Sequence, residues 1–170
     1  ISSNLERLLY DLCGEDSETL AGWMKDLAET GVYSVGDAVR EKVQQLFYGG
    51  FCGDGSTFET IRELWDTEGY LCDTHTAVAA NVMEQYRAAT GDKTVTVFVS
   101  TASPYKFCDS VLSALGEEEK QNGLELLDEL SEKTGMPAPK PLSSLRDKEI
   151  RFTQTVEKDH MVDAVLGMLE

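Results

Sequence analysis

A run of β-branched and aromatic residues at positions 94–100, with the sequence T-V-T-V-F-V-S, limits the folds that are open to this chain. Side chains branched at Cβ lose rotamer freedom in a helix and pack well on a pleated strand. Both faces of this run are largely apolar, which is typical of a central strand buried on both sides. Ser103 and Pro104 then suit the N-cap and the first residue of a helix. We therefore predict a buried strand that leads directly into a helix.

Helical periodicity dominates the rest of the chain, where apolar residues recur at intervals of three and four. Ser3 and Glu6 form a potential capping box, and Gly31 suits a left-handed C-cap. The glycine-rich aromatic stretch 47–55 suits a short strand that leads into a loop. Helices are predicted near residues 3–13, 17–30, 37–46, 56–65, 76–89, 104–115, 117–134 and 156–169. The sequence thus predicts a helix-rich α/β fold, in which helices cover a small sheet with a central buried strand near 94–100.

The charge of the chain argues against two classes of partner. Lys and Arg total 15 against 31 Asp and Glu, so a net charge of −16 repels phosphate backbones and anionic lipid heads. No apolar stretch approaches the roughly 18 residues that span a bilayer, and no basic and apolar leader is found at the start. The length of 170 residues is that of one domain. We expect a cytoplasmic protein that binds neither nucleic acid nor membrane.

The spacing of the candidate ligands disfavours metal chemistry. The four cysteines stand far apart and form no C-x-x-C pair or Cys/His cluster. The two histidines, His75 and His160, are not part of an H-E-x-x-H motif. We expect no metal site, and we expect the cysteines to be reduced.

Residues 100–107 are the first candidate for a ligand site, because α/β sheets bind ligands at the carboxyl ends of their strands. This segment offers three hydroxyl groups, the Lys106 ammonium and a helix N-terminus that attracts anions. The same residues also suit a simple helix cap, with Ser103 as the capping residue and Lys106 in solvent. From the residues alone, both interpretations stay open.

Residues 73–76 are the second candidate, since they place His75 and Asp73 together near the start of a helix. Such a pair suits an acid–base group, an anion ligand or a capping arrangement. A Ser/His/Asp hydrolase could combine the pair with Ser100 or Ser103, but the G-x-S-x-G motif of that class is missing.

Both segments resemble motifs of one enzyme family. Residues 100–107, S-T-A-S-P-Y-K-F, closely resemble the S-T-A-x-P-x-K-F segment of threonine synthases. Residues 73–78, D-T-H-T-A-V, are similar to the family's D-P-H-T-A-V segment, with Thr74 in place of the proline. Residues 1–7, I-S-S-N-L-E-R, resemble a third segment in the right order. The resemblance covers about residues 1–116, and the helical remainder matches in length and character only.

The resemblance implies a pyridoxal-phosphate enzyme of fold type II, similar to the β subunit of tryptophan synthase. Such an enzyme converts O-phosphohomoserine and water to threonine and phosphate. In the family, the cofactor lysine and the loop that grips the cofactor phosphate lie upstream of the segment where this chain begins. The resemblance thus implies a C-terminal fragment, with part of the cofactor-binding domain in about 1–116 and a helical segment in about 117–170. We expect it to hold no catalytic residue, to be inactive alone and to work with the N-terminal part of the same enzyme.

The resemblance also implies roles for three residues. Thr101 is the candidate for the hydroxyl that hydrogen-bonds the pyridine nitrogen of pyridoxal phosphate, and His75 and Lys106 are candidates for contacts to the substrate phosphate. A second hypothesis is a free-standing acidic helical module that binds a protein through a leucine stripe. The leucines of that stripe are Leu124, Leu127 and Leu130.

Overall fold

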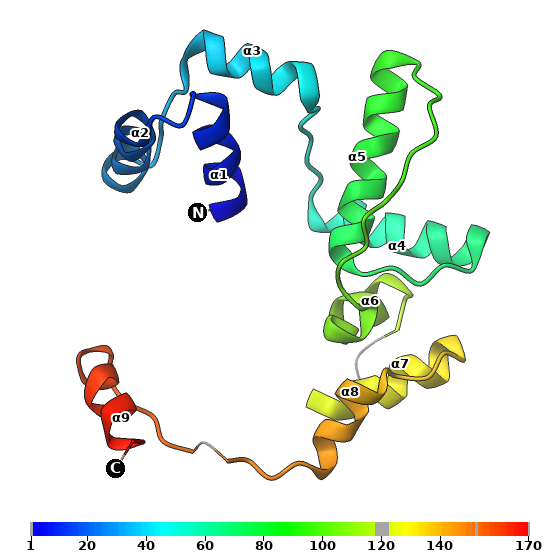
Figure 1. The fold of residues 1–170 in the computed structure, drawn as a ribbon. Coiled ribbons are helices and arrows are strands. Elements are labelled where there is room, and N and C mark those ends of the chain that lie inside the picture. The colour runs from blue at the N-terminus through cyan, green and yellow to red at the C-terminus, as the bar shows by residue number, and fades with distance from the viewer. Residues whose placement is uncertain (1, 118–122, 152, 170) are drawn as a thin grey trace. The chain divides into compact units, whose positions relative to one another are not determined.

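The computed structural model describes residues 2–117, 123–151 and 153–169 (Figure 1). Its α-helices are α1 (Ser3–Leu12), α2 (Ser17–Thr30), α3 (Gly36–Leu46), α4 (Asp54–Glu68), α5 (Thr74–Thr90), α6 (Cys108–Ala114), α7 (Leu126–Thr134), α8 (Lys140–Ser143) and α9 (Met161–Gly167). Short 3-10 helices are η1 (Pro104–Lys106), η2 (Gly123–Glu125), η3 (Ser144–Asp147) and η4 (Lys158–His160). The chain forms two compact units, Ile1–Gly53 with Ala80–Thr96, and Asp54–Ala79 with Val97–Glu170.

The first unit contains α1, α2 and α3, and α1 contacts both of the other helices. The predicted helices are confirmed here, with small shifts at their ends. The N-cap of α1 is Ser2, one residue before the predicted cap. Gly31 ends α2 in the left-handed conformation with φ 77°, as its position in the sequence predicts. The ammonium of Lys42 in α3 donates a hydrogen bond to the Leu12 carbonyl at 2.8 Å, which satisfies a free acceptor at the end of α1.

The second unit has a hydrophobic core that α4, α6 and α7 build together. Each of these helices contributes fully buried side chains, and burial of one such side chain stabilises the fold by about 1.5–3 kcal/mol. The largest aliphatic ones are Ile61, Val111, Leu112 and Leu130. Tyr105 of η1 and Leu71 and Cys72, which precede α5, belong to the same cluster. This core supports the two motif segments that the sequence singles out.

The end of α6 is fixed by an arginine from α4. The Arg62 Nε donates a hydrogen bond to the Ala114 carbonyl at 2.9 Å. Gly116 follows with φ +80°, and a Cβ at this position would lie 2.6 Å from an Arg62 guanidinium nitrogen. The positive φ favours glycine, and a Cβ at this position would also displace the Arg62 guanidinium. The sequence-based prediction that Gly116 closes this helix is therefore confirmed.

The predicted buried strand at residues 94–100 is wrong. The segment has no regular secondary structure, and no strand occurs anywhere in the described ranges. Val95, Val97 and Val99 are 88%, 82% and 81% exposed, and the residues between them are exposed as well, so neither face is buried. A strand exists only when its backbone groups pair with a neighbouring strand, and β-branched residues cannot supply that neighbour. The part of the chain that the structure describes is helical, and the predicted α/β sheet covered by helices is absent from it.

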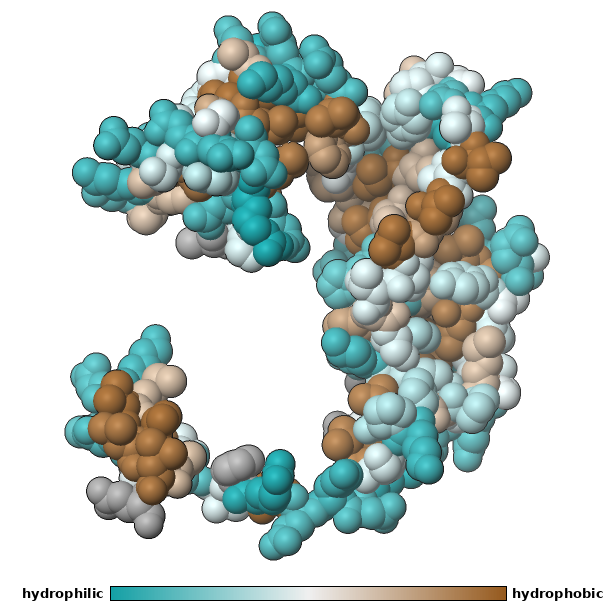
Figure 2. All heavy atoms as spheres, viewed as in Figure 1, coloured by the Kyte–Doolittle hydropathy of each residue, from teal (hydrophilic) through white to brown (hydrophobic). Residues whose placement is uncertain are grey.

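Other predicted boundaries also shift. The short strand predicted within 47–55 is replaced by irregular backbone up to Gly53, and α4 begins at Asp54 instead of Ser56. The helix predicted over 117–134 is confirmed for α7 only, and its residues 118–122 lie outside the described ranges. The last helix, α9, is shorter than the predicted 156–169. Figure 2 shows apolar side chains gathered on the visible face of α9, and those of Met161, Val162, Val165 and Leu166 are exposed. The division into parts near residue 116 stays a prediction.

Candidate functional site

The candidate site is built around the buried carboxylate of Asp73, which directly precedes α5. Its Oδ1 accepts hydrogen bonds from the backbone N–H groups of His75 at 2.9 Å and Thr76 at 3.4 Å. The hydroxyl of Thr76 donates to Oδ2. An Asp that accepts from the residues two and three positions ahead is a normal N-cap, so these contacts explain why α5 begins at this point.

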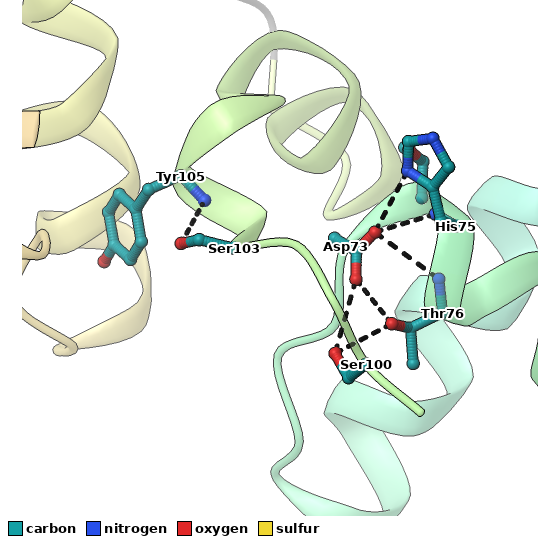
Figure 3. Close-up of polar contacts among 7 residues, drawn as sticks. Asp73, His75, Thr76, Ser100, Ser103 and Tyr105 are labelled. Atoms are coloured by element: carbon teal, nitrogen blue, oxygen red, sulfur yellow. Dashed lines mark hydrogen bonds and ion pairs between the residues drawn. The ribbon is translucent and has the colours of Figure 1, made fainter. Parts of the chain in front are cut away.

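Two further contacts go beyond helix capping and reach residue 100 (Figure 3). The Ser100 hydroxyl donates to Asp73 Oδ2 at 3.5 Å, and its Oγ lies 2.9 Å from the Thr76 hydroxyl oxygen. Residues separated by 27 positions in the sequence therefore meet at one carboxylate. The two segments that the sequence analysis selected independently, 73–78 and 100–107, come together within the second unit.

The Asp73 carboxyl is ionised at neutral pH. Burial by itself raises its pKa, but hydrogen bonds from the Thr76 hydroxyl, from both backbone N–H groups and from the His75 ring outweigh burial and lower the pKa below its ordinary value. An ionised carboxylate can only accept hydrogen bonds. Each of its partners must therefore supply a proton.

His75 is exposed, and its ring has polar and aromatic partners. Its Nδ1 is 3.2 Å from Asp73 Oδ1 and 3.5 Å from the Thr74 hydroxyl oxygen, while 70% of the side chain is exposed. The ring centroid lies 5.1 Å from that of Phe107, with the planes tilted at 51°. Lys106 holds its Nζ 5.9 Å from the centroid of the same Phe107 ring, a cation–π contact. The structure thus brings both predicted substrate-binding residues to one aromatic side chain, whose role the sequence analysis missed.

Thr101 follows Ser100 directly and is exposed. Among the described residues, the structure gives no hydrogen-bond partner for its hydroxyl. The hydroxyl of the cofactor candidate is therefore available to a ligand, while the residue before it is held by the buried carboxylate.

The predicted cap at Ser103 is confirmed. Its Oγ accepts a hydrogen bond from the backbone N–H of Tyr105 at 3.2 Å, and Pro104 begins η1 (Figure 3). Tyr105 is buried, and its hydroxyl donates to the carbonyl of Met136. Ser103 and Tyr105 therefore anchor the segment against the core. Ser100, Thr101 and Lys106 are its exposed polar residues, and of these Ser100 already has hydrogen-bond partners.

The hydrolase hypothesis finds no support in this geometry. A Ser/His/Asp triad places the histidine between the serine and the carboxylate. Here Ser100 contacts the carboxylate itself, and no described contact joins the His75 ring to Ser100 or to Ser103. The arrangement is therefore a set of donors around an anion and not a relay that would activate a serine.

Three further observations concern disulfides, metal sites and membrane-spanning helices. The four cysteines, all among the described residues, form no disulfide, and Cys72 and Cys108 are buried. Across the described ranges, no group of three His, Cys, Asp or Glu side chains is placed to hold a metal ion. The helices of the described part of the chain are too short or too polar to cross a membrane.

Comparisons with known proteins point to one family. The family profile described as threonine synthase, C-terminal, matches residues 76–165. Human threonine synthase-like 1 is 33% identical over 115 residues, which is 67% of this chain and 15% of that protein. Threonine synthase from Pseudomonas aeruginosa is 34% identical over 114 residues, which is 67% of this chain and 24% of the enzyme. The chain thus spans less than a quarter of the length of these curated relatives.

Solved structures agree with the sequence comparisons. Yeast threonine synthase aligns with 99% of this chain at a TM-score of 0.73 and 26% identity, and the aligned part is 34% of that chain. The threonine synthase from Brucella melitensis, solved with pyridoxal phosphate bound, aligns with 90% of this chain at a TM-score of 0.65 and 27% identity, over 29% of its own length. Since the profile covers more than half of the residues and the two motifs meet at one carboxylate, this chain belongs to the threonine synthase family, with its match in the C-terminal region.

Proposed function

We propose that this chain is the C-terminal part of a threonine synthase, a pyridoxal-phosphate-dependent lyase that converts O-phosphohomoserine and water to threonine and phosphate. The observation that carries the proposal is the meeting of residues 73–78 and 100–107 at the Asp73 carboxylate, because both segments match the family and together leave His75, Thr101 and Lys106 exposed. In this proposal the cofactor lysine comes from the N-terminal part of the same enzyme, and the chain supplies one wall of the site.

Thr101 fits the role of a cofactor contact. Its hydroxyl is exposed and has no described partner, and the hydrogen bonds of the neighbouring Ser100 hold the backbone on which it lies. When bound, pyridoxal phosphate withdraws electrons from the substrate carbon at which bonds are broken. A neutral hydroxyl donates a hydrogen bond to the pyridine nitrogen without favouring a fully charged ring, as a carboxylate would. Thr101 would therefore moderate this electron withdrawal, which suits an elimination followed by addition of water.

His75 and Lys106 fit the role of contacts to the substrate phosphate. Both are exposed, and both pack on the Phe107 ring, which limits the positions that their polar groups can take. Lys106 forms no ion pair with a described carboxylate, so its charge is available to a ligand. A cation and an imidazole donor are suited to a phosphate dianion. We propose that this pair holds the phosphate that leaves as product.

The experiment that tests the proposal uses a longer protein that contains this chain, purified with pyridoxal phosphate. O-Phosphohomoserine should yield phosphate and threonine in equal amounts, and the 170-residue chain alone should yield neither. Thr101→Val should weaken cofactor binding by about 1–3 kcal/mol, since a buried ring nitrogen then lacks its donor, while the fold is kept. Absence of product from the cofactor-loaded longer protein would refute the proposal, and unchanged cofactor affinity in Thr101→Val would remove Thr101 from the site.

The competing hypothesis of a protein-binding leucine stripe is not favoured by the structure. Leu127 and Leu130 are buried in the core of the second unit, and Leu124 packs against that core. These side chains already contact their own fold, and a partner protein could reach Leu127 and Leu130 only if α7 were displaced.

A further inference from the structure

Asp73 has more contacts than its capping role requires. The chain contains a second aspartate with the same capping pattern, Asp16, which accepts from the backbone N–H groups of Glu18 and Thr19 and from the Thr19 hydroxyl. Asp16 is exposed and caps α2, and its carboxylate has no described partner beyond Glu18 and Thr19. Asp16 shows which contacts are sufficient to begin a helix. The contacts that Asp73 makes and Asp16 lacks are therefore not needed for capping.

Three features distinguish Asp73 from this internal reference. Its side chain is fully buried, its Oδ1 reaches the ring Nδ1 of His75, and its Oδ2 reaches the Ser100 hydroxyl across 27 residues of sequence. Taking a carboxylate out of water is costly unless hydrogen bonds compensate. Burial of this group is therefore specifically supported by donors from both motif segments.

The directions of the hydrogen bonds to Asp73 follow from its charge. Since the ionised carboxylate only accepts, the hydrogen bond from the His75 ring requires a proton on Nδ1, and the hydrogen bond from Ser100 directs the hydroxyl proton toward Oδ2. The Nε2 of His75 then faces away from Asp73, and it donates to an anion only when the ring carries a proton on both nitrogens. The Ser100 position fixes the backbone that continues into Thr101.

We propose that Asp73 is a positioning residue that holds His75 and the Thr101 backbone in a fixed relative arrangement through the two oxygens of one carboxylate. Oδ1 selects the tautomer and orientation of the exposed imidazole, and Oδ2 anchors the segment that carries the exposed Thr101 hydroxyl. A single buried group thereby couples the substrate-facing side of the site to its cofactor-facing side. The part of this inference that concerns catalysis rests on the proposed function.

The first test is independent of activity and uses the 170-residue chain. The variant Asp73→Ser keeps a hydroxyl that can cap α5 but is too short to reach the His75 ring or the Ser100 hydroxyl. Asp16→Ser makes the same change at the reference position. Nitrogen NMR of the imidazole groups is simple, since the chain has 2 histidines and His160 lies next to Asp163 in an exposed pair. We expect a proton on Nδ1 of His75 in the wild type and in Asp16→Ser, and its loss from Nδ1 of neutral His75 in Asp73→Ser. An unchanged protonation pattern in Asp73→Ser would overturn the proposal.

The second test uses the longer, cofactor-loaded protein. Asp73→Ser should lower kcat/KM for O-phosphohomoserine about tenfold or more, with changes in both kcat and KM, while Asp16→Ser stays within about twofold of the wild type. If Asp73→Ser fails to fold, Asp73→Asn keeps the volume and a capping oxygen, but its N–H₂ group can only donate, so the Thr76 and Ser100 hydroxyls would have to turn and accept, and the negative charge is lost. The same tenfold loss is expected. A value of kcat/KM within twofold of the wild type in a folded Asp73 variant would overturn the proposal. A wild-type protein without activity would instead refute the proposed function and leave the imidazole result standing.

Discussion

Leu130 of α7 offers a quantitative test of the second unit, because its side chain is 0% exposed within the core cluster. The substitution Leu130→Ala removes three carbon atoms, a transfer loss of about 2.4 kcal/mol at roughly 0.8 kcal/mol each. The cavity that remains adds to this loss, and we expect a decrease in the free energy of unfolding of about 3–4 kcal/mol. The matched control is Leu145→Ala in η3, where the side chain is 46% exposed and the expected loss is below about 1 kcal/mol.

The assay can be confined to the second unit. The chain has 2 tryptophans, and Trp65 packs against the same core, so a Trp23→Phe background leaves Trp65 as the fluorescent reporter of urea unfolding. If Leu130 belonged to a docking face for another protein, its truncation would leave the free energy of unfolding nearly unchanged. A loss in Leu130→Ala no larger than that in Leu145→Ala would therefore refute both the buried core and the packing of α7 against it.

Two further predictions concern a pair of buried thiols and the exposed valine segment. Burial, with the nearby charge of Asp73, raises the pKa of Cys72 to about 11, and burial with Asp109 does the same for Cys108. The thiolate fraction of these cysteines at pH 8 is then lower by a factor on the order of a hundred than in an unfolded chain. Their alkylation, followed by peptide mass spectrometry, should be slower in the folded chain than in urea by at least that factor, and equal rates would contradict the burial. Backbone amide hydrogens at 95–99 should exchange with solvent at rates within about tenfold of those of an unfolded chain, since these residues are exposed and irregular. The amides of α6 should be protected. Slow exchange at 95–99 would mean that the segment is hydrogen-bonded to a neighbour.

Local features of the sequence were sufficient for most helices and for the family. The helix α2 follows from an apolar stripe bounded by a glycine, and Gly31 takes the left-handed conformation because only local backbone geometry decides that position. The cap at Ser103 is likewise set by neighbours within two residues. The motifs 73–78 and 100–107 identified the threonine synthase family without any knowledge of where they lie in space, because each motif is contiguous in the sequence.

Non-local contacts decided what the sequence could not. The residues at 94–100 have a strand-like pattern, but a strand needs a hydrogen-bonded neighbour that β-branched side chains cannot provide, and the valines lie exposed in the described structure. The burial of Asp73 and its contact with Ser100 could not be read from the sequence, because closing a loop of 27 residues depends on the core that α4, α6 and α7 form around it. The sequence thus determined which residues carry the chemistry, through motifs that act over a few positions, and the tertiary structure alone decided which of them meet.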